Sequence, residues 1–252
     1  MYEMSNETTR EPIWMSPEPG TRKSKLSRRR IAEAAIEIAD EEGFAAVSMR
    51  RVADRLGAGT MSLYHYIRDK DDLMTLIDDR LIEDVLIPEA EVPDDWREAL
   101  TQIARRSYRA WVKRPWLLAH MSDGPRVGPN MMRHIDQSIG AVSGLGLTPA
   151  EQFELISLVD DYTLGFVLGD RDAAAMKEDD WAALDRLASH TAELIQTGDF
   201  PNLEEFLGTT DEDSIIESWR EIARQLTEGD RFERGLERVL DGIAIGLERR
   251  SA

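Results

Sequence analysis

The side chains best suited to chemistry lie in the stretch GTMSLYHYIRDK, residues 59–70. Thr60, Ser62 and Tyr64 carry hydroxyl groups that can hydrogen-bond to the edges of DNA bases, and Met61 can contact the methyl group of a thymine. The stretch ends on basic residues in a chain whose formal net charge is −18. These side chains are typical of a surface that reads DNA.

The segments around this stretch predict a helix-turn-helix. Ser48 is a suitable cap for the helix MRRVADRL, whose apolar face would be buried, and the glycine-containing turn 57–59 separates it from a third helix over about 60–66. In this layout the second helix of the pair enters the major groove. Arg50 is placed to reach a guanine edge, while Ser48 and Lys70 lie at helix starts, where phosphates bind.

An ordinary helical hairpin with its tyrosines in the core is the alternative to a DNA-reading pair. Leu63 and Ile67 have the spacing of core residues. Tyr64 and His65, which lie between them, are harder to bury together, and this favours the DNA-reading interpretation.

The segment before the helix-turn-helix is basic and then helical. TRKSKLSRRR, residues 21–30, carries six basic residues, and the arm over 22–30 is expected to follow the DNA backbone or a neighbouring minor groove. Ser27 can cap a helix that ends at Gly43. Residues 1–20 are polar and rich in proline, which predicts a disordered tail; Trp14 within this tail is unexplained.

The charge is distributed unevenly. Residues 21–70 hold 11 Lys and Arg against 7 Asp and Glu, whereas residues 71–252 hold 19 against 38. The chain has no cysteine, which excludes disulfides, thiolate metal sites and cysteine nucleophiles. It shows no signal peptide and no apolar run of the roughly 20 residues that span a bilayer. A cytoplasmic protein is expected.

The remaining sequence keeps a helical period. Asp69 starts a fourth helix, and Thr148 opens a long one that runs to about residue 175. Further helices are expected over about 95–112, 129–143, 180–196 and 213–249, with the stretch TGDFPNLEEF read as a loop. The sequence therefore predicts an all-α fold with a DNA-binding domain over 21–75 and a larger helical domain over 76–252 for ligand binding and dimerisation.

Aromatic and methionine side chains concentrate in one part of the larger domain. Such groups suit a mostly apolar ligand pocket. The candidates for binding a small, largely apolar or aromatic effector are Tyr108, Trp111, Trp116, His120, Met121, Met132 and His134. For any one of these residues, the composition favours plain helix core over a ligand contact. The histidines lack the spacing of a metal motif, so neither a metal nor a cofactor is expected.

The segment VSMRRVADRLGAGTMSLYHYIRDKDDLM, residues 47–74, resembles the DNA-binding segment of tetracycline-repressor-like (TetR family) regulators. The family pattern of a small residue, a tyrosine and a following lysine is matched by Ser62, Tyr64 and Lys70. FERGLERVLDGIAIGLE, residues 232–248, resembles the last helix of the branch that includes the tetracycline repressor itself.

This resemblance implies a homodimer that binds a palindromic operator and a small-molecule inducer. It makes base-contact candidates of Arg50, Thr60, Met61, Ser62 and Tyr64, and phosphate candidates of Ser48, Tyr64 and Lys70. By the same resemblance His65 and Tyr66 are expected to pack under the recognition helix.

Dimerisation is expected through the helix after Pro149 and the C-terminal helix. LISLVDDYTLGFVLG is apolar on more than one stripe, as a helix packed on two sides must be. The C-terminal helix offers a continuous apolar face made of Leu236, Val239, Leu240, Ile243 and Leu247. Two such helices from each subunit would form a four-helix bundle.

Two other functions remain open at this point. An all-α hydrolytic enzyme would use an acid–base set drawn from His120, Asp123, His134 and Asp136, although no nucleophile elbow, phosphate loop or dinucleotide fingerprint supports it. A ligand-binding protein with a vestigial DNA contact is the other; the intact segment from Arg50 to Lys70 argues against it.

Overall fold

The computed structural model describes residues 11–19, 26–118, 127–174, 189–208, 211–227 and 229–251, and these residues form helices and connections without a strand. The predicted all-α fold is confirmed. Within this part of the chain no helix is long and apolar enough to cross a membrane. The internal contacts divide the chain into two compact units, Met1–Ser157 and Leu158–Ala252.

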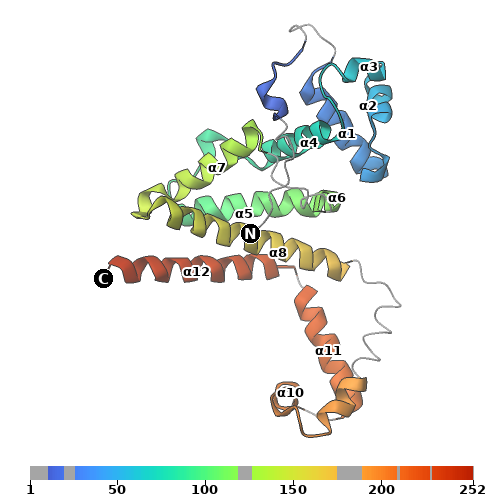
Figure 1. The fold of residues 1–252 in the computed structure, drawn as a ribbon. Helices are drawn as coiled ribbons and strands as arrows, with labels where there is room; N and C mark the ends of the chain where they lie inside the picture. The colour runs from blue at the N-terminus through green and yellow to red at the C-terminus, as the bar shows by residue number, and fades with distance from the viewer. Residues whose placement is uncertain are drawn as a thin grey trace, which may run out of the picture. The chain divides into compact units, whose positions relative to one another are not determined.

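The first unit contains the predicted helix-turn-helix and the helices next to it. Its described helices are η1 (Ile13–Met15), α1 (Arg28–Glu42), η2 (Phe44–Ala46), α2 (Met49–Leu56), α3 (Thr60–Leu63), α4 (Lys70–Val85), η3 (Glu89–Glu91), α5 (Trp96–Lys113), α6 (Pro115–Leu118), α7 (Pro129–Val142) and η5 (Ser143–Leu145). In Figure 1, α2 and α3 lie beside α1 and α4.

Local side-chain caps set where these helices begin. The hydroxyl of Ser27 accepts a hydrogen bond from the Arg30 amide, and the hydroxyl of Ser48 accepts one from the Arg51 amide. The carboxylate of Asp69 accepts from two amides in the first turn of α4. All three caps are the ones that the sequence predicts, because a cap depends only on its near neighbours.

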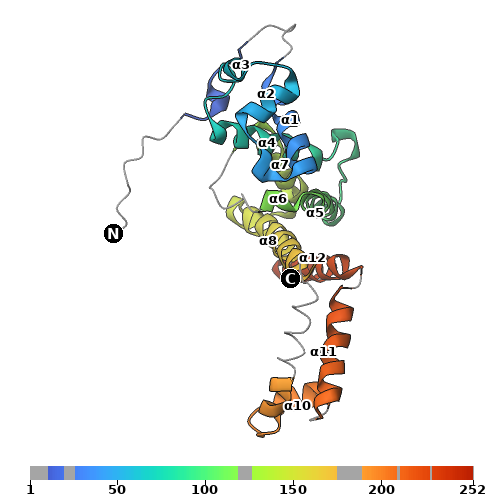
Figure 2. The ribbon, with the colours of Figure 1, turned by 90° about the vertical axis from the view of Figure 1, so that its right-hand side faces the viewer.

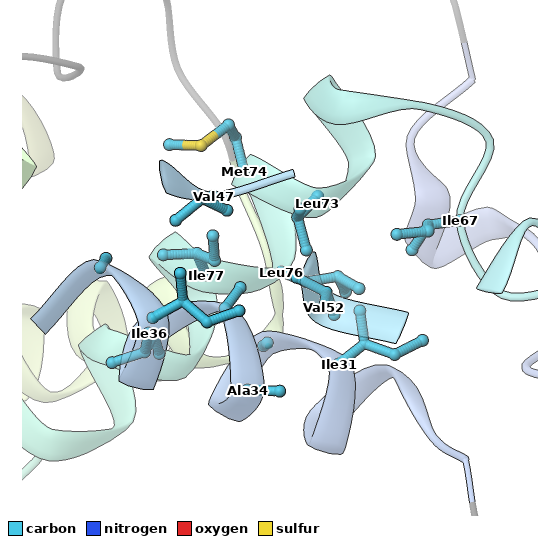
Figure 3. Close-up of a cluster of buried hydrophobic side chains, with 14 of the residues drawn as sticks. Ile31, Ala34, Ile36, Val47, Val52, Ile67, Leu73, Met74, Leu76 and Ile77 are labelled. Carbon is cyan, nitrogen blue, oxygen red and sulfur yellow. The ribbon is translucent and has the colours of Figure 1, made fainter. Parts of the chain in front are cut away.

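One apolar core holds the helix-turn-helix together. Ile31 on α1, Val52 on α2 and Ile77 on α4 are fully buried in it, and Leu63 of α3 joins them. Figure 3 shows this cluster, with Ile67 reaching it from the segment after α3 and Leu73 from α4. The core therefore holds α3 through its buried side, and the opposite side of α3 is exposed to solvent.

Residues 11–19 correct the expectation of a disordered tail. They include the short helix η1, and the side chain of Ile13, only 3% exposed, joins the core just described. Trp14 packs against the same core. Two apolar residues in a polar stretch carry no periodic signal, so their burial cannot be recognised without the surface that receives them.

The predicted domain boundary between residues 75 and 76 falls inside α4. This helix packs against α1 and also against α5 and α7. The single helix α4 thus packs against helices on both sides of the predicted boundary.

The helix α8 (Pro149–Ala174) crosses from the first unit into the second. It starts as predicted: the Thr148 hydroxyl accepts from the Glu151 amide, and the Glu151 carboxylate accepts from the amide and the hydroxyl of Thr148. This reciprocal pair is a capping box.

The second unit continues with α10 (Pro201–Leu207), α11 (Glu212–Thr227) and α12 (Arg231–Ser251). The predicted loop TGDFPNLEEF is wrong in its second half, which forms α10. Figure 2 shows α10 beside one end of α11, where Leu207 and Ile215 are buried in a small apolar cluster with Ala192 and Ile195.

Candidate nucleic-acid interface and the helices behind it

The turn between α2 and α3 depends on a glycine. Gly57 has a left-handed backbone conformation, with φ of 62°, and its amide donates to the carbonyls of Ala53 and Asp54 at the end of α2. A residue with a Cβ is strained in this conformation. After two more residues, Gly59 precedes α3 in an extended conformation. The chain therefore reverses abruptly and presents α3 beside α2.

The predicted DNA contacts lie on the outer side of this pair. We call the following set the reading face: Ser48, Arg50, Thr60, Met61, Ser62, Tyr64 and Lys70. Met61 is 75% exposed and Tyr64 is 45% exposed, although both are large apolar side chains. Their neighbours Leu63 and Ile67 are fully buried. This alternation anchors α3 while its outward side chains are left for a partner.

The charged members of the reading face are open to solvent. The Arg50 side chain is 87% exposed and its only close carboxylate in the described residues, Asp54, is 3.9 Å away. An ion pair at that distance and exposure contributes little, so the guanidinium is available to a base or a phosphate. Lys70 is exposed at the start of α4, with its Nζ atom 5.4 Å from the centre of the Phe44 ring.

Tyr66 and His65 differ in their exposure to solvent. Tyr66 is buried, as expected for a residue packed under the recognition helix. His65 is exposed, so the same expectation is wrong for it. The segment after Leu63 is a turn in which the amides of Tyr66 and Ile67 both donate to the Leu63 carbonyl. The side chain of His65 therefore points away from the core.

Two described residues of the basic arm, Arg28 and Arg29, are held by contacts within the chain. Arg28 is buried, and its guanidinium donates to the carbonyls of Tyr66 and Ser16. Arg29 pairs with Glu33 and Glu83. The expectation of an arm over 22–30 is therefore corrected for these two residues, whereas 21–25 lie outside the described residues.

Behind the reading face, α4 is joined to α7 through a buried carboxylate. The side chain of Asp79 is 5% exposed, and its Oδ1 atom accepts from the Asn130 amide at 2.8 Å and from the Met131 amide at 3.4 Å. The side-chain amide of Asn130 donates back to the Asp79 carbonyl and to Oδ2, both at 3.0 Å.

This carboxylate caps the first turn of α7 from another helix. Burial raises the pKa of Asp79, and the hydrogen bonds from Asn130 and Met131 oppose that shift. Gly128 precedes α7, and a Cβ placed on it would lie 2.9 Å from the Asp79 Cβ and closer still to the carboxyl group. The two helices therefore meet where only a glycine fits.

The predicted effector residues are divided among several places. Tyr108 and Trp111 are half-buried on α5, which packs against α7. On α7, Met132 is 55% exposed, and burial lowers the pKa of His134. His120 and Met121 lie outside the described residues. Among the described residues no three His, Asp or Glu side chains gather as a metal site.

Trp116 is placed elsewhere. Its ring stacks on Phe44 with centroids 5.6 Å apart, and its indole N–H donates to Asp40 at 2.9 Å. These contacts attach α6 to the DNA-binding helices. We therefore leave Trp116 out of the proposed effector pocket.

In the second unit, α8 and α12 are joined by aromatic side chains. Tyr162 donates its hydroxyl to the Phe232 carbonyl at 2.8 Å, and the two rings stack at 5.7 Å. Leu236 and Leu240, expected in a dimer interface, are buried within the subunit instead. Leu158 and Ile245 remain about half exposed on α8 and α12.

Comparison with known proteins agrees with this geometry. The family model of bacterial regulatory proteins of the tetR family matches residues 31–77, and that of the tetracyclin repressor-like C-terminal domain matches residues 88–246. The chain belongs to the TetR family of transcriptional regulators, with a tetracycline repressor-like C-terminal domain. This family consists of regulators and not of enzymes, so the hydrolytic alternative drawn from His120, Asp123, His134 and Asp136 is wrong.

Relatives in streptomycetes are similar over nearly the whole chain. The HTH-type transcriptional repressor DrrR1 of Streptomyces coeruleorubidus is 32% identical and covers 96% of this chain and 87% of its own. Apo ActR of Streptomyces coelicolor is 26% identical with a TM-score of 0.66, over 90% of this chain and 99% of ActR. ActR in complex with actinorhodin is 28% identical with the same TM-score, over 88% and 96%.

Proposed function

We propose that this TetR-family regulator acts as a repressor that reads its operator with Arg50, Thr60, Met61, Ser62 and Tyr64. The observation that carries the proposal is the exposure of Met61 and Tyr64 on a helix whose other side is anchored in the core. Exposed apolar side chains beside hydroxyl groups match the mixture of methyl groups and polar edges in a major groove. Ser48 and Lys70 hold phosphates at the two sides of the reading face.

A homodimer is the natural form of this repressor. Two copies of α3 would need to lie about 34–36 Å apart to reach successive major grooves of a palindromic operator. Exposed Leu158 and Ile245, together with Phe153 earlier on α8, supply apolar surface on the helices expected to meet the second subunit. Such a repressor works in the cytoplasm, where the operator is.

Effector binding would release the repressor from DNA through the contact between Asp79 of α4 and the first turn of α7. An effector bound among Tyr108, Trp111, Met132 and His134 would contact α5 and α7, both packed against α4. Because α7 is capped by Asp79, a shift of its first turn displaces α4, and α4 begins at the reading face. The effector then changes the population of DNA-binding dimers by its differential affinity for the two arrangements.

The test is operator binding by matched variants, on a DNA site recovered by selection from a random pool. Tyr64→Ala and Met61→Ala are each expected to weaken operator binding about fivefold or more, because the loss of one matched base pair costs about 1–3 kcal/mol. Met132→Ala is the matched control, since Met132 is also an exposed methionine but lies on α7. It should leave operator affinity unchanged in the absence of effector.

Unchanged operator affinity in both reading-face variants would contradict operator reading by these residues, whereas failure to recover any site from the pool would favour a ligand-binding protein with a vestigial DNA contact. Actinorhodin, which is bound in the ActR complex, is the first effector to try. If actinorhodin lowers operator affinity, and lowers it less in Trp111→Ala, the effector site on α5 is supported.

A further inference from the structure

Residues 11–19 are attached to the DNA-reading helices at several points. Ile13 is buried in the same core as Leu63 and Ile67, which anchor α3 and the turn after it. Glu18 accepts a hydrogen bond from the Arg28 amide at the start of α1. This segment is therefore held by packing and by polar contacts at once.

Arg28 joins this segment directly to the end of the recognition helix. Its Nε atom donates to the Tyr66 carbonyl at 3.2 Å, and its Nη1 atom donates to the Ser16 carbonyl at 3.0 Å. Arg28 is 9% exposed; its hydrogen bond to Tyr66 is buried, and the one to Ser16 is partly buried. A buried arginine that lost these acceptors would be costly, which makes the arrangement specific.

Arg68 makes a second connection on the other side of Tyr66. Its Nη2 atom donates to the Glu11 carbonyl at 2.9 Å. The rest of the guanidinium is held by both oxygens of Asp72, each at 2.8 Å. Ser16 is thus linked through Arg28 to Tyr66, the last residue of the turn that follows α3, and Glu11 is linked to Arg68, two residues further on.

The recognition helix needs such support because it is short. As a regular helix α3 spans only Thr60–Leu63, a single turn. Such a short helix is not stable by itself, so its direction must be set by what holds its ends. Gly57 and Gly59 define its start, and the Arg28 hydrogen bond to Tyr66 holds the segment just beyond its end.

We propose that residues 11–19 are a working part of the operator-reading unit and that Arg28 is a positioning residue for the recognition helix. Arg28 acts by fixing the Tyr66 carbonyl against the segment 11–19, and it makes no contact with phosphate. This inference rests on operator binding as proposed above. It assigns a DNA-binding role to a stretch of chain that precedes the helix-turn-helix.

The first test compares Arg28→Met with Arg29→Met on operator and on unrelated duplex DNA over a range of salt concentrations. Arg28→Met is expected to weaken operator binding about tenfold or more, the value of a lost hydrogen bond from a charged group. Its affinity for unrelated DNA and its salt slope should not change, because no phosphate contact is lost. Arg29→Met is the neighbouring control and should change operator affinity by less than about twofold, since its ion pairs are exposed.

Two results would overturn the proposal. One is unchanged operator affinity in folded Arg28→Met. The other is a parallel loss on both DNAs with a salt slope lower by about 0.9 per subunit, which identifies Arg28 as a phosphate contact instead. Arg28→Lys should recover part of the lost operator affinity, because an ammonium group can still donate to a carbonyl.

A second measurement, which needs no DNA, tests the proposal even if Arg28→Met fails to fold. Hydrogen exchange is followed in the full chain and in a chain lacking residues 2–19. Removal of the segment should speed exchange of the Ser62 and Tyr64 amides, which donate within α3, while core amides of α4 stay protected. Equal exchange at Ser62 and Tyr64 in the two chains would overturn the positioning role, whether or not an operator is found.

Discussion

Replacement of Gly128 with alanine is expected to destabilise the joint between α4 and α7. Gly128 has φ of −116°, a conformation that alanine also adopts, so the backbone itself is not strained. The added Cβ would lie 2.6 Å from the Asp79 Cγ atom and 2.9 Å from its Cβ. Real atoms do not approach so closely, and one side of the contact must move.

Two structural changes could relieve this contact, and the one with the lower free-energy cost sets the loss of stability. If Asp79 rotates away, the Asn130 and Met131 amides lose a charged acceptor, at a cost of about 1.5–3 kcal/mol. If the helices separate instead, overpacking costs about 1–3 kcal/mol. Alanine recovers about 0.4–1 kcal/mol by restricting the unfolded chain. A net loss of about 1–2 kcal/mol is expected, or roughly 2–8 °C in Tm for a chain of this size.

Thermal unfolding of Gly128→Ala beside Gly140→Ala measures this effect. Gly140 lies inside α7 with nothing within 4 Å of a Cβ, so its alanine variant should gain about 0.5–1 kcal/mol. In the Asp79→Ala background Gly128→Ala should cost less, because the carboxyl group is absent. If Gly128→Ala were as stable as Gly140→Ala, the close contact between Gly128 and Asp79 would be refuted.

Three further predictions concern other parts of the molecule. A Cβ on Gly235 would lie 2.7 Å from the Tyr162 Cζ atom, so Gly235→Ala should lower the free energy of unfolding by about 1–3 kcal/mol in urea titrations, whereas Gly242→Ala, with open space, should not. Burial, with a smaller contribution from Asp161, raises the pKa of Asp160 to about 6, so the folded state binds an extra proton between pH 4 and 6 and loses stability as the pH rises through that range. Asp160→Asn should therefore raise Tm at pH 8 but not at pH 4, and an equal change at both would contradict the burial of this carboxyl group. Lys70→Gln should lower the salt slope of operator binding by about 0.9 per subunit, and an unchanged slope would remove Lys70 from the phosphate contacts.

The sequence predicts best what neighbouring residues decide. Ser48 and Asp69 cap their helices as predicted, and Thr148 with Glu151 forms the predicted box, because each cap requires only residues three positions away. The same local signals were present for α10, where Pro201 occupies the first turn and Gly208 ends the helix with φ of 69°. A helix of only seven residues is too short to show a clear period in the sequence, so the stretch reads as a loop.

Long-range packing decides what the sequence does not predict. Arg28 belongs to a run of basic residues that suggests DNA contact, yet its acceptors lie 12 and 38 positions away. Trp116 fits the composition of an effector pocket but contacts Phe44 and Asp40, more than 70 positions earlier. Residue type alone does not distinguish these uses, since arginine and tryptophan serve equally in cores and in binding sites.

The exposure of Met61 and Tyr64, by contrast, follows from the sequence pattern, while their contact with DNA is a prediction that operator binding tests. A helix-turn-helix fixes which positions of its second helix point outward, and the alternation of Leu63 and Ile67 with Met61 and Tyr64 specifies the same side. The chemistry of the outward residues then follows from their side chains.

Selection of bound sequences from a random pool of duplex DNA, at moderate salt with the full chain, tests the central claim most directly. Enrichment of an inverted repeat with half-sites about one helical turn apart is the predicted result, because two copies of α3 would read successive major grooves. Failure of a folded chain to enrich any sequence would contradict operator reading by Arg50, Thr60, Met61, Ser62 and Tyr64.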